Sequence, residues 1–249
     1  RDHTENILRS FGADIEDSAM DDGGRKIAIR GFVELTATDV FVPGDPSSAA
    51  YPGVAALIVP GSEVTVENVG MNPLRVGLFE TLREMGADVT LTKVRLAAGE
   101  EVADITFRHG PLTGIDIPAT RAPAMIDEYP IAAVAAAVAS GETRMRGLAE
   151  LRFKESDRFA AILDGLAACG VGAKADGDDI VIQGCGGVPE GGCEIAVNFD
   201  HRIGMSFLVL GLASQNPVSI DDAASIRTSF PGFVELMNGI GTQIWEQNL

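Results

Sequence analysis

The sequence predicts an α/β protein built from repeated βαβαββ units, and three observations support this fold class. Three stretches of the chain run through the same order of segments: an Asp, an apolar helix, a polar strand, a second helix that stops at a Gly, and a further strand. The opening Asp and the Gly lie 41, 43 and 41 residues apart, and such a constant interval indicates a repeat architecture. The apolar residues are small, since 46% of the chain is hydrophobic but only 6% is aromatic, which favours closely packed layers. The three pairs are Asp45–Gly86, Asp127–Gly170 and Asp200–Gly241.

The segment before the first unit predicts a helix and a hairpin. A helical pattern within residues 4–18 ends at Gly12 and is followed by an extended segment at residues 13–15. A turn at residues 21–24 then leads into a strand at residues 26–30, as in a hairpin. Residues 40–43 are expected to be extended, with a boundary at Pro43-Gly44. This order matches the second half of a unit, so we expect a fourth unit whose first half is absent.

Each full unit is predicted from helix start and stop signals. An Asp accepts hydrogen bonds from the free N–H groups of the helix after it, and a Gly at the helix end adopts the left-handed conformation. Packing the units together would bury their Ala-rich first helices against one another. The first helices are expected at residues 47–59, 129–139 and 203–213, with strands at 62–66, 142–145 and 216–220. The second helices are expected at residues 78–86, 159–170 and 233–241, with strands at 87–89, 171–173 and 242–244.

Composition and charge exclude several classes of partner. The formal net charge of −17 excludes nucleic acid, which needs a basic face. An anionic substrate would require a local cluster of cations. The longest run of small apolar residues, Ile131–Ala139, is too short to span a bilayer, and we expect no membrane partner.

Cysteines and histidines predict neither a metal site nor a cofactor. The cysteines are odd in number and share no metal-ligand spacing, which indicates thiols of a reducing compartment, the cytoplasm. The histidines are far apart, and the glycines near residue 186 form no dinucleotide-binding fingerprint. The residues concerned are Cys169, Cys185 and Cys193, and His3, His109 and His201.

The stretch Leu151–Arg158 holds five charged residues in eight, and two interpretations remain open. We expect it to begin a helix, which would place Lys154 and Arg158 on one face, although like charges at this spacing are unfavourable. In the first interpretation the stretch is a solvated turn with Lys154–Asp157 and Glu155–Arg158 ion pairs. In the second it is an anion pocket that contains a carboxylate.

The three Asp caps differ in the residues next to them. Asp45 precedes neutral residues and is interpreted as structural, whereas Asp127 is followed by a second acid, so that one carboxylate could act as a base. Asp200 is followed by His201 and Arg202, which puts a cation at a helix N-terminus, where the macrodipole disfavours it. Arg202 therefore either recognises an anion or forms a salt bridge, and His201 is either a hydrogen-bonding partner or a chemical group.

These motifs together resemble the 5-enolpyruvylshikimate-3-phosphate synthase family, in its bacterial branch. The resemblance rests on Leu151–Arg158, on residues 44–50 and on Asp200-His201-Arg202, and it extends to residues 1–5 and 228–231. It implies an enolpyruvyl-transferase-like, inside-out α/β barrel, with two similar domains of three βαβαββ units joined by a hinge. By this resemblance residues 1–43 end an upstream domain, residues 44–249 form a three-repeat domain, and the chain matches the C-terminal part of the family.

The resemblance also implies a reaction. The 5-hydroxyl of shikimate 3-phosphate adds to the enolpyruvyl carbon of phosphoenolpyruvate, and phosphate is then eliminated. Such chemistry needs a base, an acid for the methylene carbon, and cations for phosphates and a carboxylate. The implied catalytic residues are Asp127 as general base and Glu155 as the group that protonates and deprotonates the methylene carbon. The implied substrate-binding residues are Lys154 for both substrates, Arg158 and Arg202 for phosphoenolpyruvate, His201 near that site, and Arg1 for the shikimate phosphate.

The chain departs from the family pattern in two ways. Some members have a lysine where this chain has Thr228, with Arg227 one residue earlier. The cations that the family contributes upstream are absent, so we expect the chain alone to be inactive and to work with an N-terminal fragment of the same enzyme. The alternatives are a UDP-N-acetylglucosamine enolpyruvyl transferase, which the Leu151–Arg158 and Asp200–Arg202 motifs disfavour, and a non-catalytic scaffold module.

Overall fold

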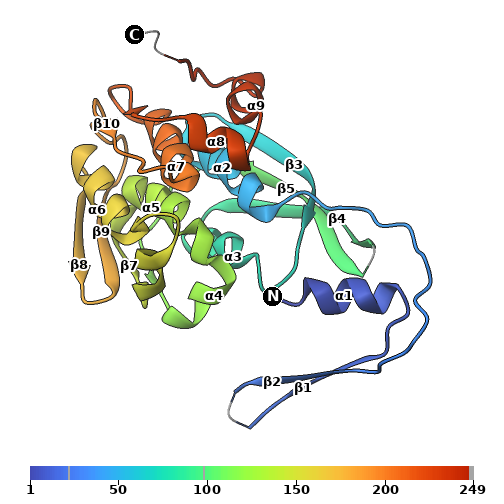
Figure 1. Ribbon diagram of the computed structural model, residues 1–249. Helices are drawn as coiled ribbons and strands as arrows, with labels where there is room; N and C mark the ends of the chain where they lie inside the picture. Colours follow the sequence, from blue (N-terminus) through green and yellow to red (C-terminus); the bar gives the residue numbers. More distant parts are fainter. Residues whose placement is uncertain (22, 98, 247–249) are drawn as a thin grey trace.

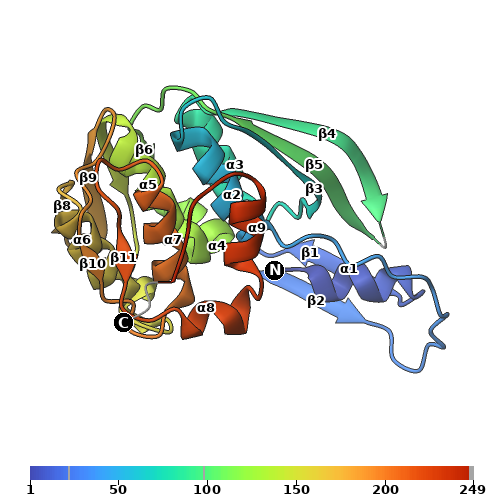
Figure 2. The ribbon, with the colours of Figure 1, turned by 90° about the horizontal axis from the view of Figure 1, so that it is seen from above.

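Three apolar helices form the centre of the molecule in the computed structural model, which describes residues 1–21, 23–97 and 99–246. They are α2 (Pro46–Ile58), α5 (Tyr129–Val138) and α7 (His201–Gly211), and they pack against one another (Figure 1). Nearly every residue of α2 and α5 is buried, as expected of helices that are apolar on all sides. The strands lie outside this helical core (Figure 2), so the predicted burial of the first helices is confirmed.

The strands repeat one pairing pattern around the core. In the first unit Gly44 makes a parallel bridge to Val69, and the sheet order is β3-β5-β4 with antiparallel neighbours. In the second unit β6 pairs in parallel with β7, and the order is β6-β7-β9-β8. In the third unit β10 and β11 again form a parallel pair. The strands are β3 (Glu63–Gly70), β4 (Asp88–Ala97), β5 (Glu100–Arg108), β6 (Asp116–Ile117), β7 (Ser140–Met145), β8 (Gly172–Asp176), β9 (Asp179–Cys185), β10 (Glu194–Ile195) and β11 (Ser219–Ile220).

The second helix of each unit ends as the sequence predicts. These helices are α3 (Gly77–Glu84), α6 (Arg158–Ala168) and α9 (Phe233–Gly239), and α1 (His3–Ser10) ends in the same way. The glycine after each helix is left-handed, with φ of 92° at Gly86, 76° at Gly170, 106° at Gly241 and 87° at Gly12. The remaining helices are α4 (Ala122–Met125), α8 (Ala224–Ser229) and the 3-10 helices at Ala119–Arg121, Ile126–Glu128 and Ala149–Phe153.

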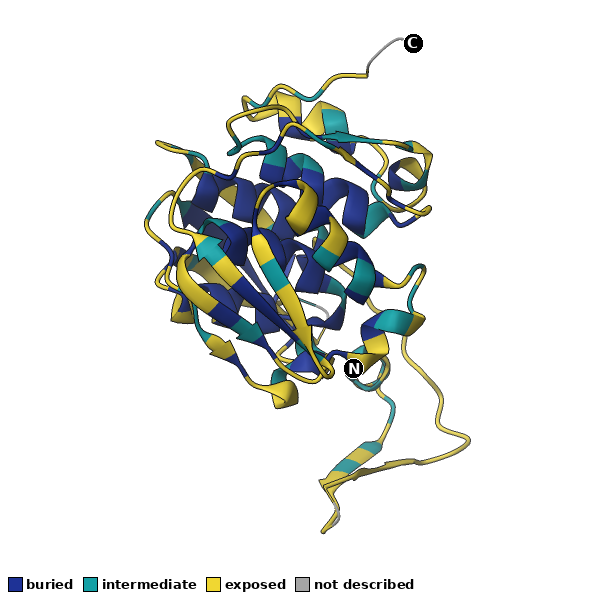
Figure 3. Ribbon diagram, turned by 90° about the vertical axis from the view of Figure 1, so that its left-hand side faces the viewer, coloured by how far each residue is buried: buried dark blue, intermediate teal, exposed yellow. Residues whose placement is uncertain are grey.

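The N-terminal segment lies outside the core. It contains α1 and the predicted hairpin, formed by β1 (Ile15–Ala19) and β2 (Arg25–Ile29), and none of the described residues before Pro46 is buried (Figure 3). Contacts to Glu100 at the start of β5 hold α1, with His3 Nδ1 at 2.9 Å and Asn6 Nδ2 at 3.3 Å from its carboxylate. None of the described helices is long and apolar enough to cross a membrane.

One expected strand is wrong. Residues 242–244 form no strand, because the backbone of Ile244 bonds to a side chain instead of to a neighbouring strand. The side-chain amide of Asn238 donates to the Ile244 carbonyl at 2.7 Å and its oxygen accepts from the Ile244 N–H at 2.8 Å. Residues 40–43, expected to be extended, belong to no strand, and Gly44 directly after them makes a bridge to Val69.

Close packing between the first central helix and its sheet depends on Gly53. A Cβ added at Gly53 in α2 would lie 2.7 Å from Cζ of Phe107, a wholly buried side chain of β5. The ring of Phe107 is held in turn by Phe79 of α3, with ring centroids 5.8 Å apart. Neither ring can move without disturbing the core, so this glycine sets the distance between helix and sheet.

We predict that Gly53→Ala lowers the free energy of unfolding by about 1–3 kcal/mol through overpacking. The matched control is Gly239→Ala in α9, where an added Cβ has open space around it. In the control, alanine's better helix propensity leaves stability unchanged or raises it by up to about 1 kcal/mol. Urea unfolding of both variants measures the difference, and equal effects would contradict this account.

Candidate active site

The N-termini of the three central helices meet at one place. Ser47 at the start of α2 donates a hydrogen bond to the carboxylate of Glu128, which directly precedes α5. Arg202 in the first turn of α7 donates to the backbone carbonyl of Asp127 at 3.3 Å and lies 3.6 Å from the Glu128 carboxylate. Helix N-termini carry partial positive charge and free N–H groups, so their convergence favours bound anions.

The buried guanidinium of Arg158 links the start of α6 to this meeting point. Its side chain is 0% exposed, as is that of Asp200. Nε and Nη2 of Arg158 donate to the two oxygens of Asp200 at 2.8 and 3.3 Å, in the bidentate arrangement that makes strong ion pairs. Nη1 donates to Asp127 at 3.4 Å, and Nη2 also bonds to Glu155. Three carboxylates from different parts of the sequence therefore share one cation.

Asp200 also caps α7, as predicted. Its Oδ1 accepts a hydrogen bond from the Arg202 N–H at 3.0 Å, and its Oδ2 accepts one from the Ser156 hydroxyl at 3.0 Å. Asp45 likewise caps α2 by accepting from the Ser48 N–H at 2.9 Å. Both predicted caps are confirmed, and Asp200 has the additional task of neutralising Arg158.

The predicted cap at Asp127 is wrong. Asp127 lies within the 3-10 helix Ile126–Glu128, and Glu128 takes the cap position of α5 without a side-chain cap bond. The reason is electrostatic, because the Asp127 carboxylate is drawn away from the helix by Arg158 and by Arg1, whose Nη2 lies 3.1 Å from it.

The charged stretch Leu151–Arg158 is a helix start only at its last residue. Asp157 caps α6 by accepting from the Ala160 N–H at 3.0 Å, which fixes the helix start at Arg158. Lys154 lies before this cap in an extended conformation, so it does not share a helix face with Arg158. Lys154 pairs with Glu150 at 2.7 Å in place of the expected Asp157, whereas the expected Glu155–Arg158 pair is present.

Charges around the meeting point shift several pKa values. Burial opposes ionisation of Asp127, but Arg202 and Arg1 hold the pKa of Asp127 below its ordinary value. Burial likewise opposes ionisation of Asp200, yet Arg158 holds the pKa of that carboxyl low. Burial raises the pKa of Glu128 despite the hydrogen bond from Ser47. The pKa values of these neighbouring carboxyls are thus shifted in opposite directions, a pattern common at functional sites.

Two further basic residues that the sequence indicates behave differently. Burial and then the neighbouring Arg202 lower the pKa of His201, so its imidazole is neutral near pH 7. Arg227 is 67% exposed and lies 3.7 Å from Glu246, in a surface ion pair. His201 lies beside the meeting point because it is the first residue of α7.

Sequence reasoning missed Arg75. Its Nη2 donates to Asp45 at 2.7 Å and to the Ser47 hydroxyl at 2.9 Å, and its buried Nε has no hydrogen-bond partner. Arg75 therefore adds a cation beside the start of α2. It stands alone in the turn before α3, 30 residues after Asp45, and no local motif marks it.

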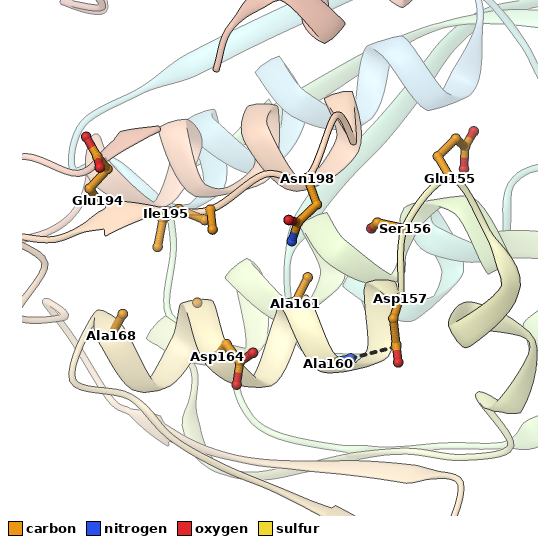
Figure 4. A pocket seen from close by; sticks show the side chains of 12 residues that line it. Glu155, Ser156, Asp157, Ala160, Ala161, Asp164, Ala168, Glu194, Ile195 and Asn198 are labelled. Atoms are coloured by element: carbon orange, nitrogen blue, oxygen red, sulfur yellow. Dashed lines mark hydrogen bonds between the residues drawn. The ribbon is translucent and has the colours of Figure 1, made fainter. Parts of the chain in front are cut away.

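A groove runs from Glu155 along one face of α6 (Figure 4). It has a volume of about 460 Å³ and lies between α6 and the chain around β10. In the first unit the corresponding place beside α3 is occupied by α4. This helix belongs to the connection of nine residues between β6 and Asp127. Only four residues separate β10 from Asp200, so α6 has no such cover. This short connection contains two left-handed residues, Asn198 with φ of 50° and Phe199 with φ of 60°.

No group of three or more His, Cys, Asp or Glu side chains among the described residues is arranged to hold a metal ion. Arg121, which is half-buried, and Arg146, which is exposed, form ion pairs with Glu84 and Asp116. The sequence assigns no function to either arginine.

The family described as EPSP synthase (3-phosphoshikimate 1-carboxyvinyltransferase) matches residues 1–237. This chain belongs to the EPSP synthase family. A 3-phosphoshikimate 1-carboxyvinyltransferase of Rhodospirillum rubrum is 59% identical over 98% of the chain and 54% of that relative. One from Paramagnetospirillum magneticum is 58% identical over 100% of the chain and 56% of that relative. The chain therefore spans about half the length of the curated relatives it matches.

Solved structures confirm the α/β fold. EPSP synthase from Acinetobacter baumannii matches with a TM-score of 0.90 and 42% identity, covering 97% of this chain and 54% of that one. The enolpyruvyl transferase NikO from Streptomyces tendae matches with a TM-score of 0.68 at 20% identity, over 94% of this chain and 51% of that one, which shows likeness of fold alone.

We predict that Arg158→Met lowers the free energy of unfolding by about 3–5 kcal/mol, because it leaves Asp200 buried and charged without its partner. The matched control is Arg146→Met, which removes an arginine that binds Asp116 through two nitrogens at 2.7 Å but is 44% exposed. An exposed pair contributes about 0–1 kcal/mol, so the control should be nearly neutral. Chemical denaturation measures the free energy of unfolding of both variants. If Arg158→Met leaves this free energy unchanged, the central role of the Arg158–Asp200 ion pair is refuted.

We predict that His201 makes the protein less stable in mild acid. The folded-state pKa of His201 lies below the ordinary value of 6.5, so the unfolded chain takes up a proton at a higher pH than the folded chain does. Stability contributed by neutral His201 is present above about pH 6.5 and is lost as the pH falls through the folded-state pKa. The measurement is the free energy of unfolding of wild type minus that of His201→Gln between pH 7.5 and pH 5. This difference should become smaller as the pH is lowered from 7.5 to 5. A difference that stays constant or grows as the pH is lowered would contradict the lowered pKa of His201.

Proposed function

We propose that this chain is the C-terminal part of an enzyme that transfers the enolpyruvyl group of phosphoenolpyruvate to the 5-hydroxyl of shikimate 3-phosphate. The observation that carries the proposal is the gathering of Asp127, Glu155 and Asp200 around Arg158 in a chain of the EPSP synthase family. The names of relatives 55–59% identical to the chain support the same substrates. The cations around Asp127 give a local positive field in a chain whose formal net charge is −17.

Asp127 is proposed as the general base. Its carboxylate is ionised near neutral pH because cations hold its pKa low, so it can accept a proton from the substrate hydroxyl. A low pKa makes a weak base, but two anionic substrates would neutralise part of the field of Arg202 and Lys154. The pKa of Asp127 would then rise toward the value that proton transfer requires.

Glu155 is proposed as the group that serves the methylene carbon. Its side chain is 52% exposed, compared with 21% for Asp127 and 0% for Asp200, so it is the most accessible of the three carboxylates on Arg158. In the first step the C–O bond forms as the hydroxyl proton leaves to Asp127 and Glu155 protonates the methylene carbon. In the second step the C–O bond to phosphate breaks and Glu155 takes a proton back from the resulting methyl group. Phosphate leaves as the free anion, and the proton held by Asp127 passes to it or to water, which restores the base.

The remaining residues are proposed to hold the substrate anions. Arg202, Lys154 and Arg158 would bind phosphoenolpyruvate, with Lys154 reaching both substrates and His201 nearby, and Arg1 would bind the shikimate phosphate. The donors of Arg158 already bind carboxylates, so a substrate oxygen there would exchange with Glu155 or Asp127. Binding and positioning of the catalytic groups would then be linked through one side chain.

The rest of the site is proposed to come from an N-terminal part of the same enzyme. Residues 1–43 would end the upstream domain and residues 44–249 would form the three-repeat domain, which the exposure of the N-terminal hairpin favours. The chain's coverage of 53–56% of its relatives is consistent with such a division. We propose a cytoplasmic location, which the three free thiols support. A UDP-N-acetylglucosamine substrate is less well supported, because the similar curated relatives carry the phosphoshikimate name.

We predict that the chain alone gives no turnover and that adding the N-terminal half of a relative restores phosphate release from the two substrates. In the reconstituted enzyme Glu155→Gln should lower kcat by about 10²–10⁴-fold, the usual contribution of a positioned acid or base. The matched control is Asp164→Asn, also an acid beside the groove but on the exposed side of α6, which should retain activity. If the chain is a scaffold module, the reconstituted protein should release no phosphate from phosphoenolpyruvate with shikimate 3-phosphate. Turnover by the chain alone would refute the proposal that the site is divided between two parts of the enzyme.

A further inference from the structure

Two cysteines that lie 24 residues apart in the sequence touch in the structure. The sulfur atoms of Cys169 and Cys193 are 3.3 Å apart, and both residues are free thiols. Cys169 is buried at the C-terminal end of α6, and Cys193 is half-buried directly before β10. The contact therefore joins the second unit to the third. The third cysteine, Cys185, is exposed at the end of β9.

The backbone on both sides holds the two thiols together. The N–H of Cys169 donates to the Gly165 carbonyl at 3.1 Å, and the Cys169 carbonyl accepts from the Gly191 N–H at 3.3 Å. The carbonyl of Cys193 accepts from the Ser219 N–H at 3.0 Å, which ties it to the start of β11. The loop before Cys193 also packs closely on the helix end, since a Cβ at Gly170 would lie 2.8 Å from Glu190. The contact is thus built by the fold on both sides.

We propose that Cys169 and Cys193 form a redox modification site that a hydroperoxide converts into a disulfide. A disulfide has an S–S distance of about 2.05 Å, so the sulfur atoms must approach by just over 1 Å. Side-chain rotation and a small shift of the Cys193 loop can supply such a movement. This inference is independent of the proposed enzymatic function.

The reaction balances as two thiols plus one hydrogen peroxide giving one disulfide and two waters. The thiolate of the more accessible Cys193 attacks the peroxide, an S–O bond forms, the O–O bond breaks and the first water leaves. The thiolate of Cys169 then attacks the Cys193 sulfur and expels the second water. Burial raises the pKa of Cys169 to about 12, so this second step accelerates as the pH increases.

The disulfide would act on the groove that runs beside α6. Ala168 and Glu194, the chain neighbours of the two cysteines, line one end of this groove, and Glu155 and Ser156 line the other (Figure 4). A covalent bond would fix the end of α6 against β10. The start of α6 already carries Arg158, which binds Asp200 of the third unit, so both ends of the helix would then be tied to that unit.

The experiment treats the full chain with hydrogen peroxide and counts its thiols, then maps linked peptides by mass spectrometry without reduction. We expect the number of titratable thiols to fall from three to one, the mass to fall by two hydrogens, and the linked peptides to contain Cys169 and Cys193. The oxidised monomer should unfold at a higher temperature than the reduced one, and dithiothreitol should reverse both changes. The rate of disulfide formation should increase with pH.

Single substitutions separate this site from general thiol oxidation. Cys185→Ser is the matched control and should still form the disulfide, whereas Cys193→Ser, at a half-buried position, should not. Cys169→Ser places a hydroxyl in a buried position, so circular dichroism must first show that this variant is folded. Retention of all three thiols, oxidation of Cys193 to sulfinic acid without a disulfide, or dimers linked only through Cys185 would each overturn the proposal.

Discussion

The structure depends on the buried ion pair between Arg158 and Asp200. Two charges that are wholly removed from water carry a large desolvation penalty, which is offset only when their geometry and remaining hydrogen bonds are satisfied. Here the pair is bidentate, Ser156 donates to Asp200, and the backbone of Arg202 donates to it as well. Because Arg158 begins α6 and Asp200 caps α7, the same contact that balances the charges fixes the second unit against the third. The same ion pair therefore determines both the stability of the fold and the geometry of the candidate site.

The repeat explains how the site is placed, and the differences between units explain its chemistry. Each unit directs the N-terminus of an apolar helix toward the same point, so one packing rule brings three positive helix ends together. The charges placed there differ from unit to unit: an Asp45 cap neutralised by Arg75 in the first, two acids in the second, and a cap followed by His201 and Arg202 in the third. A symmetric core thus supports an asymmetric set of charges.

Local signals in the sequence predict the elements, whereas distant contacts decide the site. Asp caps and glycine stops act within four residues, and the structure confirms the caps at Asp45 and Asp200 and the left-handed glycines after the second helices. Two of the carboxylate partners of Arg158, Asp127 and Asp200, lie 31 and 42 residues away, and Arg75 has no motif, so pattern alone could not assign these contacts. The same applies to the contact of Cys169 with Cys193. The cap expected at Asp127 is wrong because cations from other elements compete for its carboxylate more strongly than the helix end does.

The short connection between β10 and Asp200 has a consequence for how this fold can vary. The length of an exposed loop can change during evolution with little effect on stability, because a longer loop adds little to the entropic cost of folding. A difference of five residues between equivalent connections decides whether the outer surface of a helix is covered by its own chain or left open beside the carboxylate of Glu155. Insertion next to the exposed residues Asn198 and Phe199 would fill that space, whereas Val197 in the same connection is part of the core. Insertions or deletions in this connection alone could therefore open or close the groove beside α6. The charged residues of the candidate site would not have to change.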